Sequence, residues 1–429
     1  MHKLLKTIWT WMALAVLGGV CLPSVAWPAN ADIAIYREVT GAEDEDNQTI
    51  HDEAFDTTVR QDGEFTKGGS DILVDLATGG HYYAWYTLHF IATSGTDRTE
   101  HVGHLDLAGT DLEAGYGSGY KRGAEGVDEV YISGGAIIQA NAGDDIKVEA
   151  QNTSAVTTNN LQRRANLNGL MLLKLDDDWD YLRLHETTGG TNYNSATFTG
   201  FTWDTQDEVD AGSFSHTGGN ANVTLEQAGH YLVTYTIHLN TGTTSQRIEM
   251  TSRLQINGTT QEHCYSGTYI RGNNNAHGTN DGVIAGTCIV NNATGGNDLV
   301  VQIARTGPAT TTINDVGDQS GLTIVKLPDD ADYIRIHESG GGQSVDVTDS
   351  PVTYDTNDEV DAAFTHSTST NTDDITINSA GDYLLTGCTR SGRASGTNRY
   401  AVLHEWRVNS TKRQYGGFGW YNRGDQGTD

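Results

Sequence analysis

The chain has 429 residues, with 26 Lys and Arg against 56 Asp and Glu, for a formal net charge of −30. This excess of acid disfavours nucleic acid and anionic membranes as partners, because both recruit basic proteins. The length exceeds the roughly 250 residues that one hydrophobic core usually covers, so several domains are expected. The 51 glycines and many Thr, Asn and Asp residues are typical of turn-rich strands rather than helices.

The first 31 residues have the layout of a secretory signal peptide. Lys3 and Lys6 precede an apolar run over residues 8–20, and Ala29-Asn30-Ala31 provides small residues for cleavage. The run is shorter than the roughly 20 residues that a membrane-spanning helix needs. We therefore predict an acidic protein, secreted or at the cell surface, that begins near Asp32 and does not insert into the membrane.

The rest of the chain contains one pattern three times. Gly80-His81-Tyr82 recurs as Gly229-His230-Tyr231 and Gly381-Asp382-Tyr383, at offsets of 149 and 152 residues. A period of this length indicates tandem domains, whereas solenoid repeats are far shorter. The predicted divisions are the signal peptide (1–31), repeat 1 (32–179), repeat 2 (180–331) and repeat 3 (332–429).

Within each repeat, short alternating segments are separated by polar, Gly-rich turns. Tyr231, Val233, Tyr235 and Ile237 fall on one face of a strand, because side chains alternate along an extended chain. Roughly eight to ten such segments in each repeat are typical of a β-sandwich. The predicted fold class is all-β, with three tandem antiparallel jelly-roll β-sandwich domains, of which the third is incomplete.

Repeat 3 is shorter than repeat 2 at its end. Repeat 2 continues from Gly272 through a closing apolar segment at residues 322–327, whereas only residues 425–429 follow the equivalent Gly424. A sandwich without those strands would expose core and unpaired sheet edges. We expect a fragment of a longer reading frame, with strand donation by another chain as the alternative.

Two motifs resemble the C1q and tumour-necrosis-factor-like jelly-roll superfamily. They are a Gly-x-Tyr that opens an alternating strand, as in 229–235, and a closing segment at 319–324, which 167–172 matches in repeat 1. Leu167 and Gln319 replace the closing aromatic of that family, and no collagen-like stem is present. The resemblance implies the fold and a tendency to three-fold association.

Short linkers of about four residues join the repeats, at 176–179 and 328–331. Linkers this short restrict how neighbouring domains can lie. Together with the three-fold association that the resemblance implies, they predict either self-association or an intramolecular pseudo-trimer closed by the three repeats of one chain. A rigid rod of domains is the alternative.

A Tyr followed two positions later by Arg is the most regular polar feature. Tyr and Arg side chains can stack on a sugar and hydrogen-bond to a carboxylate, although the same residues could serve packing alone. The candidate ligand-binding residues, with a second set of equivalent arginines, are Tyr120, Arg122, Tyr269, Arg271, Tyr421, Arg423, Arg98, Arg247 and Arg399.

An acidic run recurs in repeats 2 and 3 in what the sequence suggests is a loop. Clustered carboxylates can coordinate calcium through several oxygens, and a solvated turn is the alternative. Repeat 1 has Arg60 within the equivalent run, which counts against a shared calcium site. The candidate ligands are Asp204, Asp207, Glu208, Asp210, Asp355, Asp358, Glu359 and Asp361.

Cysteines and catalytic motifs complete the sequence evidence. Cys264 and Cys288 lie in one repeat and could form a disulfide in an oxidising compartment, which leaves Cys388 over. The sequence contains no nucleophile elbow, zinc-binding His motif, phosphate loop or dinucleotide fingerprint. The prediction is a non-catalytic protein for adhesion or binding, without a required cofactor, that recognises a glycan or protein. The alternative is a polysaccharide-active enzyme or its carbohydrate-binding part.

Overall fold

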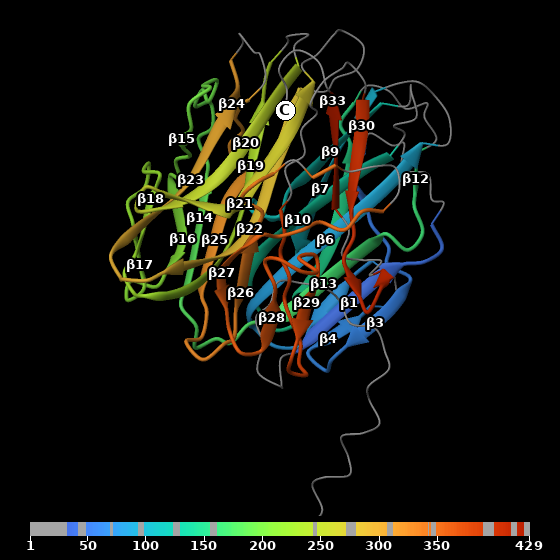
Figure 1. Ribbon diagram of the computed structural model, residues 1–429. Coiled ribbons are helices and arrows are strands. Elements are labelled where there is room, and N and C mark those ends of the chain that lie inside the picture. Colours follow the sequence, from blue (N-terminus) through green and yellow to red (C-terminus); the bar gives the residue numbers. More distant parts are fainter. Residues whose placement is uncertain are drawn as a thin grey trace, which may run out of the picture.

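The computed structural model describes residues 32–41, 49–68, 72–92, 98–122, 129–154, 161–242, 247–271, 280–306, 312–341, 343–344, 349–388, 399–412 and 418–423. The named elements in these ranges are all β-strands, which confirms the all-β class (Figure 1). No helix in the described ranges is long and apolar enough to cross a membrane.

Repeat 1 folds into two antiparallel sheets. Their strand orders are β10-β6-β13-β1-β3, with β12 on β6, and β4-β5-β11-β7-β8, with β2 on β11 and β9 on β7. The strands are β1 (Ile33–Glu38), β2 (His51–Asp52), β3 (Thr57–Gln61), β4 (Phe65–Lys67), β5 (Val74–Leu76), β6 (Gly80–Ala92), β7 (Arg98–Leu107), β8 (Thr110–Asp111), β9 (Gly117–Arg122), β10 (Glu129–Ala140), β11 (Asp145–Asn152), β12 (Leu161–Arg163) and β13 (Asn168–Lys174).

Repeat 2 forms a second pair of sheets. Their orders are β16-β14-β25-β19-β22, with β24 on β19, and β17-β18-β23-β20-β21, with β15 on β23. The strands are β14 (Tyr181–Glu186), β15 (Thr199–Gly200), β16 (Thr205–Val209), β17 (Phe214–His216), β18 (Asn222–Leu225), β19 (Gly229–Asn240), β20 (Arg247–Ile256), β21 (Thr259–Arg271), β22 (Asp281–Asn292), β23 (Asn297–Arg305), β24 (Asn314–Asp315) and β25 (Ser320–Lys326).

The strand pairing in both repeats is that of a jelly roll. In repeat 1 the antiparallel pairs β1·β13, β5·β11, β6·β10 and β7·β9 are nested one inside another, as in a long hairpin. In repeat 2 the pairs β14·β25, β18·β23, β19·β22 and β20·β21 are nested in the same way. Rolling such a hairpin places its pairs alternately in two sheets, which is the double-sheet jelly roll expected from the sequence.

Repeat 3 has strands in four two-stranded sheets. They pair β26 (Ile334–His337) with β27 (Thr356–Val360), β28 (Phe364–His366) with β29 (Ile375–Ile377), β30 (Arg399–His404) with β33 (Phe418–Arg423), and β31 (Arg407–Val408) with β32 (Thr411–Lys412). The pairs β26·β27 and β30·β33 correspond to β14·β16 and β20·β21 of repeat 2. The division of the chain into three domains, with the boundaries given above, stays a prediction.

The Gly-x-Tyr motif has a local structural cause. Gly80 and Gly229 have φ of 140° and 141°, a conformation that L-residues rarely adopt. The tyrosine that follows each of them donates its hydroxyl to a carbonyl four residues upstream, over 2.6 Å for Tyr82 and 2.8 Å for Tyr231. The motif therefore fixes the turn that precedes the long central strand, β6 or β19.

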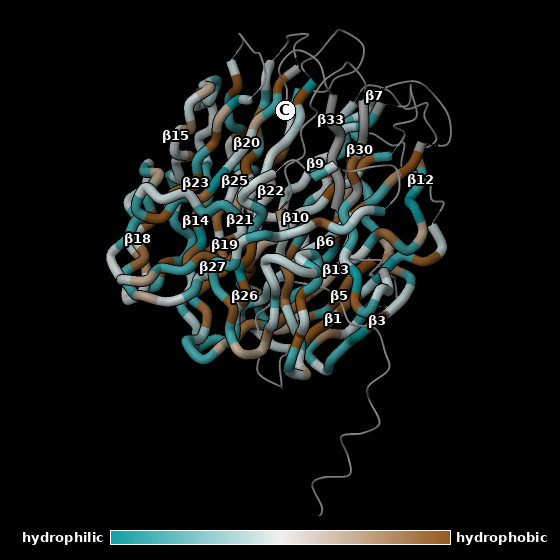
Figure 2. Tube along the Cα trace, in the orientation of Figure 1, coloured by the Kyte–Doolittle hydropathy of each residue, from teal (hydrophilic) through white to brown (hydrophobic). Residues whose placement is uncertain are grey.

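Each of the first two repeats has its own apolar core between its sheets. The core of repeat 1 includes Tyr36, Phe65 and Leu172, and that of repeat 2 includes Trp203 and Tyr235, all nearly inaccessible to solvent. The hydropathy of the chain follows this arrangement, because hydrophobic residues lie along the strands and hydrophilic residues occupy the peripheral turns (Figure 2).

A further apolar cluster, which we call the shared cluster, is built from all three repeats. Tyr83 and Met171 of repeat 1, Leu232 and Val325 of repeat 2 and Leu384 of repeat 3 are buried together in it. Strand alternation explains its origin, because Leu232 lies between Tyr231 and Val233, which face the core of repeat 2. The outward faces of these central strands are therefore apolar as well, and they pack against the neighbouring repeats (Figure 1).

Candidate functional site

The predicted ligand-binding arginines occupy opposite positions in the registers of neighbouring strands. The registers place Arg98 opposite Arg122 in β7·β9, and Arg247 opposite Arg271 in β20·β21. The register of β30·β33 places Arg399 opposite Arg423. The offsets in the sequence define two sets of equivalent arginines, and the registers join them into three equivalent cross-strand pairs, which we call the arginine pairs.

The tyrosines of the same motif bring two repeats together. The ring of Tyr120 in β9 lies 5.3 Å from the ring of Tyr269 in β21, at an interplanar angle of 54°. Tyr120 is 8% exposed. The third equivalent, Tyr421, lies in β33. The Tyr-x-Arg segments of repeats 1 and 2 therefore meet at a contact between repeats.

The strands that carry the three Tyr-x-Arg segments also converge. Strand β33 contacts both β9 and β21, and β9 contacts β22 of repeat 2. A hydrogen bond joins these last two strands, because the backbone N–H of Val283 donates to the hydroxyl of Ser118 over 2.7 Å. The strands β9, β21 and β33, each of which carries one arginine of a pair, are consequently neighbours.

A buried carboxyl group lies at this contact and was not recognised in the sequence. Glu100 is opposite Tyr120 in the register of β7·β9 and is 2% exposed. Burial and the nearby carboxylate of Asp281 in repeat 2 raise the pKa of Glu100 well above its usual range, although a backbone N–H of Asp281 opposes the shift. No sequence pattern could reveal this, because the two residues are brought together only by the packing of two repeats.

We predict that Glu100→Gln makes the protein more stable at high pH. A raised pKa means that the folded state binds the proton more tightly than the unfolded state, so the stability from Glu100 is complete below pH 4.5 and is lost as pH rises through the folded pKa. Gln cannot ionise, so the variant escapes this loss. Urea midpoints measured from pH 4 to pH 9 should agree at the acid end and diverge in favour of the variant above it.

The control for this prediction is Glu226→Gln, which removes an exposed carboxylate. Its stability curve should run parallel to that of the unmodified protein. Parallel curves for Glu100→Gln as well would show that Glu100 is ionised in the folded protein at neutral pH.

The acidic runs are strands, so the loop expected from the sequence is wrong. Residues 205–209 form β16 and residues 356–360 form β27, and successive side chains in a strand point to opposite faces. In β16, Asp207 bonds to His185 over 2.8 Å while Glu208 bonds to His81 of repeat 1 over 2.9 Å. Neighbouring carboxylates are thereby directed to different partners.

The remaining carboxylates of the runs bind backbone amides and nearby side chains. Asp204 accepts hydrogen bonds from the backbone N–H groups of Thr187 and Thr188, and these and adjacent hydroxyl bonds hold its pKa well below the usual range although burial opposes them. Hydrogen bonds to other protein groups are also formed by Asp210, Asp355, Asp358, Glu359 and Asp361. Calcium binding by these eight residues stays a prediction.

In the described part of the chain, another group of side chains has potential ligand atoms close enough together to hold a metal ion. The Nε2 atom of His104 lies 3.2 Å from a carboxylate oxygen of Asp111 and 2.8 Å from one of Glu149. Repeat 2 has Arg253 bonded to Gln302 over 2.9 Å at the positions equivalent to His104 and Glu149. The same contact is thus made without ligand-type residues, which indicates a structural cross-strand bond.

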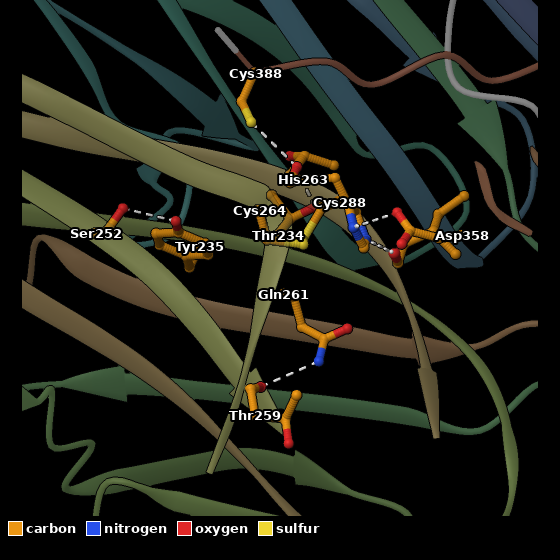
Figure 3. Close-up of a disulfide and its surroundings, with 12 residues drawn as sticks. Thr234, Tyr235, Ser252, Thr259, Gln261, His263, Cys264, Cys288, Asp358 and Cys388 are labelled. Carbon is orange, nitrogen blue, oxygen red and sulfur yellow. Dashed lines mark hydrogen bonds and ion pairs between the residues drawn. A yellow bond between two sulfur atoms is a disulfide. The ribbon is translucent and has the colours of Figure 1, made fainter. Parts of the chain in front are cut away.

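The cysteines of repeat 2 are joined in a disulfide. Cys264 of β21 and Cys288 of β22 are bonded, with Cα atoms 5.7 Å apart (Figure 3). Cys388 of repeat 3 is free, and its thiol lies 3.1 Å from the carbonyl oxygen of His263 in repeat 2. Burial raises the pKa of this thiol, so its packing role is favoured over reactivity.

Comparisons with known proteins return structural similarity alone. No protein-family model matches the chain, and no curated protein matches it. A crystal structure of murine APRIL at pH 8.0 is similar at 16% identity and a TM-score of 0.25, over 35% of this chain and 100% of APRIL. The structure of Eiger TNF from S. frugiperda is similar at 15% identity and a TM-score of 0.26, over 39% of this chain and 99% of Eiger.

Proposed function

We propose that this chain is a secreted, non-catalytic binding protein whose three repeats close a pseudo-trimer and whose arginine pairs bind a carboxylated glycan. The observation that carries the proposal is the recurrence of one cross-strand arginine pair in every repeat, at Arg98–Arg122, Arg247–Arg271 and Arg399–Arg423. A ring of repeats would bring these three pairs around one axis, where a multivalent ligand could contact all of them.

Contacts between every pair of repeats support the ring. Repeat 1 contacts repeat 2 through His81 and Glu208, and repeat 2 contacts repeat 3 through His230 and Glu359. Repeat 3 returns to repeat 1 through Asp382, which binds Arg60 over 2.6 Å. A rod of three domains would leave its first and last repeats apart, so the return contact favours the ring.

The charge of the arginine pairs supports an anionic ligand. Arginine binds carboxylates through two parallel hydrogen bonds, so paired arginines suit a ligand that carries a series of carboxylates. These pairs recur in a chain whose formal net charge is −30.

The proposed function is tested with polygalacturonate as the probe and neutral dextran as its control. We expect the full chain to bind polygalacturonate, with an affinity that falls as salt rises, and not to bind dextran. Arg247→Gln/Arg271→Gln should weaken binding at least tenfold, because it removes one complete pair. Isothermal titration calorimetry gives the affinities.

The matched control is Arg164→Gln/Arg407→Gln, which removes the same formal charge from exposed ion pairs elsewhere. It should leave the affinity within about twofold. Equal losses in the two variants would mean that net charge alone governs binding, and no binding of the probe by the unmodified chain would reject the carboxylated-glycan assignment.

A further inference from the structure

The three contacts between repeats use the same two sequence positions each time. One position is the middle residue of Gly-x-Tyr, occupied by His81, His230 and Asp382. The other is the fifth residue of the acidic run or its equivalent, occupied by Glu208, Glu359 and Arg60. The strand registers confirm this equivalence, because each of these residues lies opposite the same position of the first strand of its repeat. The opposite residues are Arg183 for Glu208, Arg335 for Glu359 and Ile35 for Arg60.

The first two contacts are chemically alike. Nε2 of His81 lies 2.9 Å from a carboxylate oxygen of Glu208, and its ring stacks on Tyr181 with 3.7 Å between centroids. Nε2 of His230 lies 2.9 Å from Glu359. The ring of His230 stacks on Tyr333 with 3.9 Å between centroids. Each contact thus joins an imidazole of one repeat to a carboxylate and a tyrosine of the next.

The third contact, which closes the ring, has the opposite polarity. Here the first position is the acid Asp382 and the second is the base Arg60, with 2.6 Å between nitrogen and oxygen. The position of the stacking tyrosine is occupied by Ile33, and the position of Arg183 and Arg335 by Ile35. An arginine at position 35 would lie opposite Arg60, so the isoleucine avoids a repulsive pair. The closing contact therefore differs from the first two contacts at four positions, which are 33, 35, 60 and 382.

We infer that this inverted pair is a recognition device that directs the face of repeat 3 carrying Asp382 to the face of repeat 1 carrying Arg60, and so fixes the order of the repeats in the ring. The inference rests on the ring in the proposed function. Its partner is defined by chemistry: among the three contacts that the described residues form, the acid of repeat 3 fits the base of repeat 1 and not the acids Glu208 and Glu359.

Wrong pairings carry a penalty that the correct order avoids. Asp382 placed against Glu208 or Glu359 would put two carboxylates together, and His81 or His230 placed against Arg60 would lose its acceptor. Repulsion of this kind excludes competing partners more effectively than attraction alone selects the right one. Because Arg60 and Asp382 are 35% and 37% exposed, their attraction contributes more to specificity than to stability.

The first experiment is a double-mutant cycle in the full chain with Arg60→Glu, Asp382→Arg and both together. Each single change places like charges at the closing contact, so we expect a lower urea midpoint and concentration-dependent oligomers in light scattering. The double variant restores the attraction and should return to a monomer with most of the lost midpoint recovered. The cycle isolates the pair from Asp62, which also binds Arg60. Purely additive effects would overturn the inference.

The second experiment makes all three contacts alike. The substitutions Ile33→Tyr, Ile35→Arg, Arg60→Glu and Asp382→His copy the chemistry of the first two contacts into the closing contact. Faces from different chains then become interchangeable, so we expect folded oligomers that increase with concentration, unlike the double variant. A graft that stays as monomeric as the unmodified chain would show that the linkers alone fix the order.

Failure of the ring itself gives a different result. If the repeats do not close a ring, small-angle scattering of the unmodified chain is extended and the substitutions at positions 60 and 382 leave it unchanged. If the ring exists without charge-directed order, the unmodified chain is compact and the cycle is additive.

Discussion

Leu232→Asp will destabilise the protein by about 4 kcal/mol and separate its repeats, because it buries an unpaired charge in the shared cluster. Leu232 is fully buried there, together with Met171 of repeat 1 and Leu384 of repeat 3. Its side chain faces away from the core of repeat 2. The variant should therefore keep the β-sheet signal of repeat 2 while its radius of gyration rises in small-angle scattering.

Two further variants sharpen this test. Leu232→Ala removes the same contacts without adding charge, so it should cost less, about 2 to 3 kcal/mol. Thr259→Asp adds the same charge at an exposed position of β21 and should leave the urea midpoint nearly unchanged. If Leu232→Asp behaves like Thr259→Asp, the shared cluster does not hold the repeats together.

The sheet architecture follows from local patterns in the sequence. Alternation in segments such as Tyr231 to Ile237 predicts strands with one buried face, and the nested antiparallel pairs confirm the jelly roll. Alternation could not predict that Leu232, on the other face, is also buried, because a second apolar face can be covered by any neighbour. The neighbour is set by packing between repeats, which are about 150 residues apart in the chain.

The acidic runs show why a local pattern can mislead about a site. Asp207 and Glu208 are adjacent in the sequence, and the clustered acids predict a loop in which both bind one calcium ion. Their backbone is extended, so Asp207 turns to His185 in its own repeat and Glu208 turns to His81 in another. A comparison of equivalent positions does indicate the contact between repeats. Repeat 1 has Arg60 where repeat 2 has Glu208, and repeat 3 has Asp382 where repeat 1 has His81, so the charges change in a matched way.

The sequence predicts which arginines are equivalent in the three repeats, but not that they form pairs. The equal offsets make Arg98 equivalent to Arg247 and Arg399. They likewise make Arg122 equivalent to Arg271 and Arg423. Offsets do not indicate how far apart these two sets lie in space. The hairpin registers β7·β9, β20·β21 and β30·β33 supply this information. Pairing registers depend on turn geometry and on the whole sheet, so they are not fixed by spacing alone.

Removal of the disulfide by Cys264→Ala/Cys288→Ala will destabilise repeat 2 by about 3 kcal/mol, because the bond closes a loop with a sequence separation of 24 residues. It joins β21 and β22, which are the edge strands of the two sheets of repeat 2, so its loss frees the sandwich to open at that side. The change is measured as the free energy of unfolding in urea, and dithiothreitol should lower the stability of the unmodified protein by the same amount.

Cys388→Ala is the matched control, because it removes a thiol that forms no disulfide. It should retain the sensitivity to dithiothreitol, whereas the double variant should lose it. A double variant as stable as the unmodified protein would show that the sandwich holds its edge without the covalent link, and the case for an oxidising compartment would then rest on the predicted signal peptide alone.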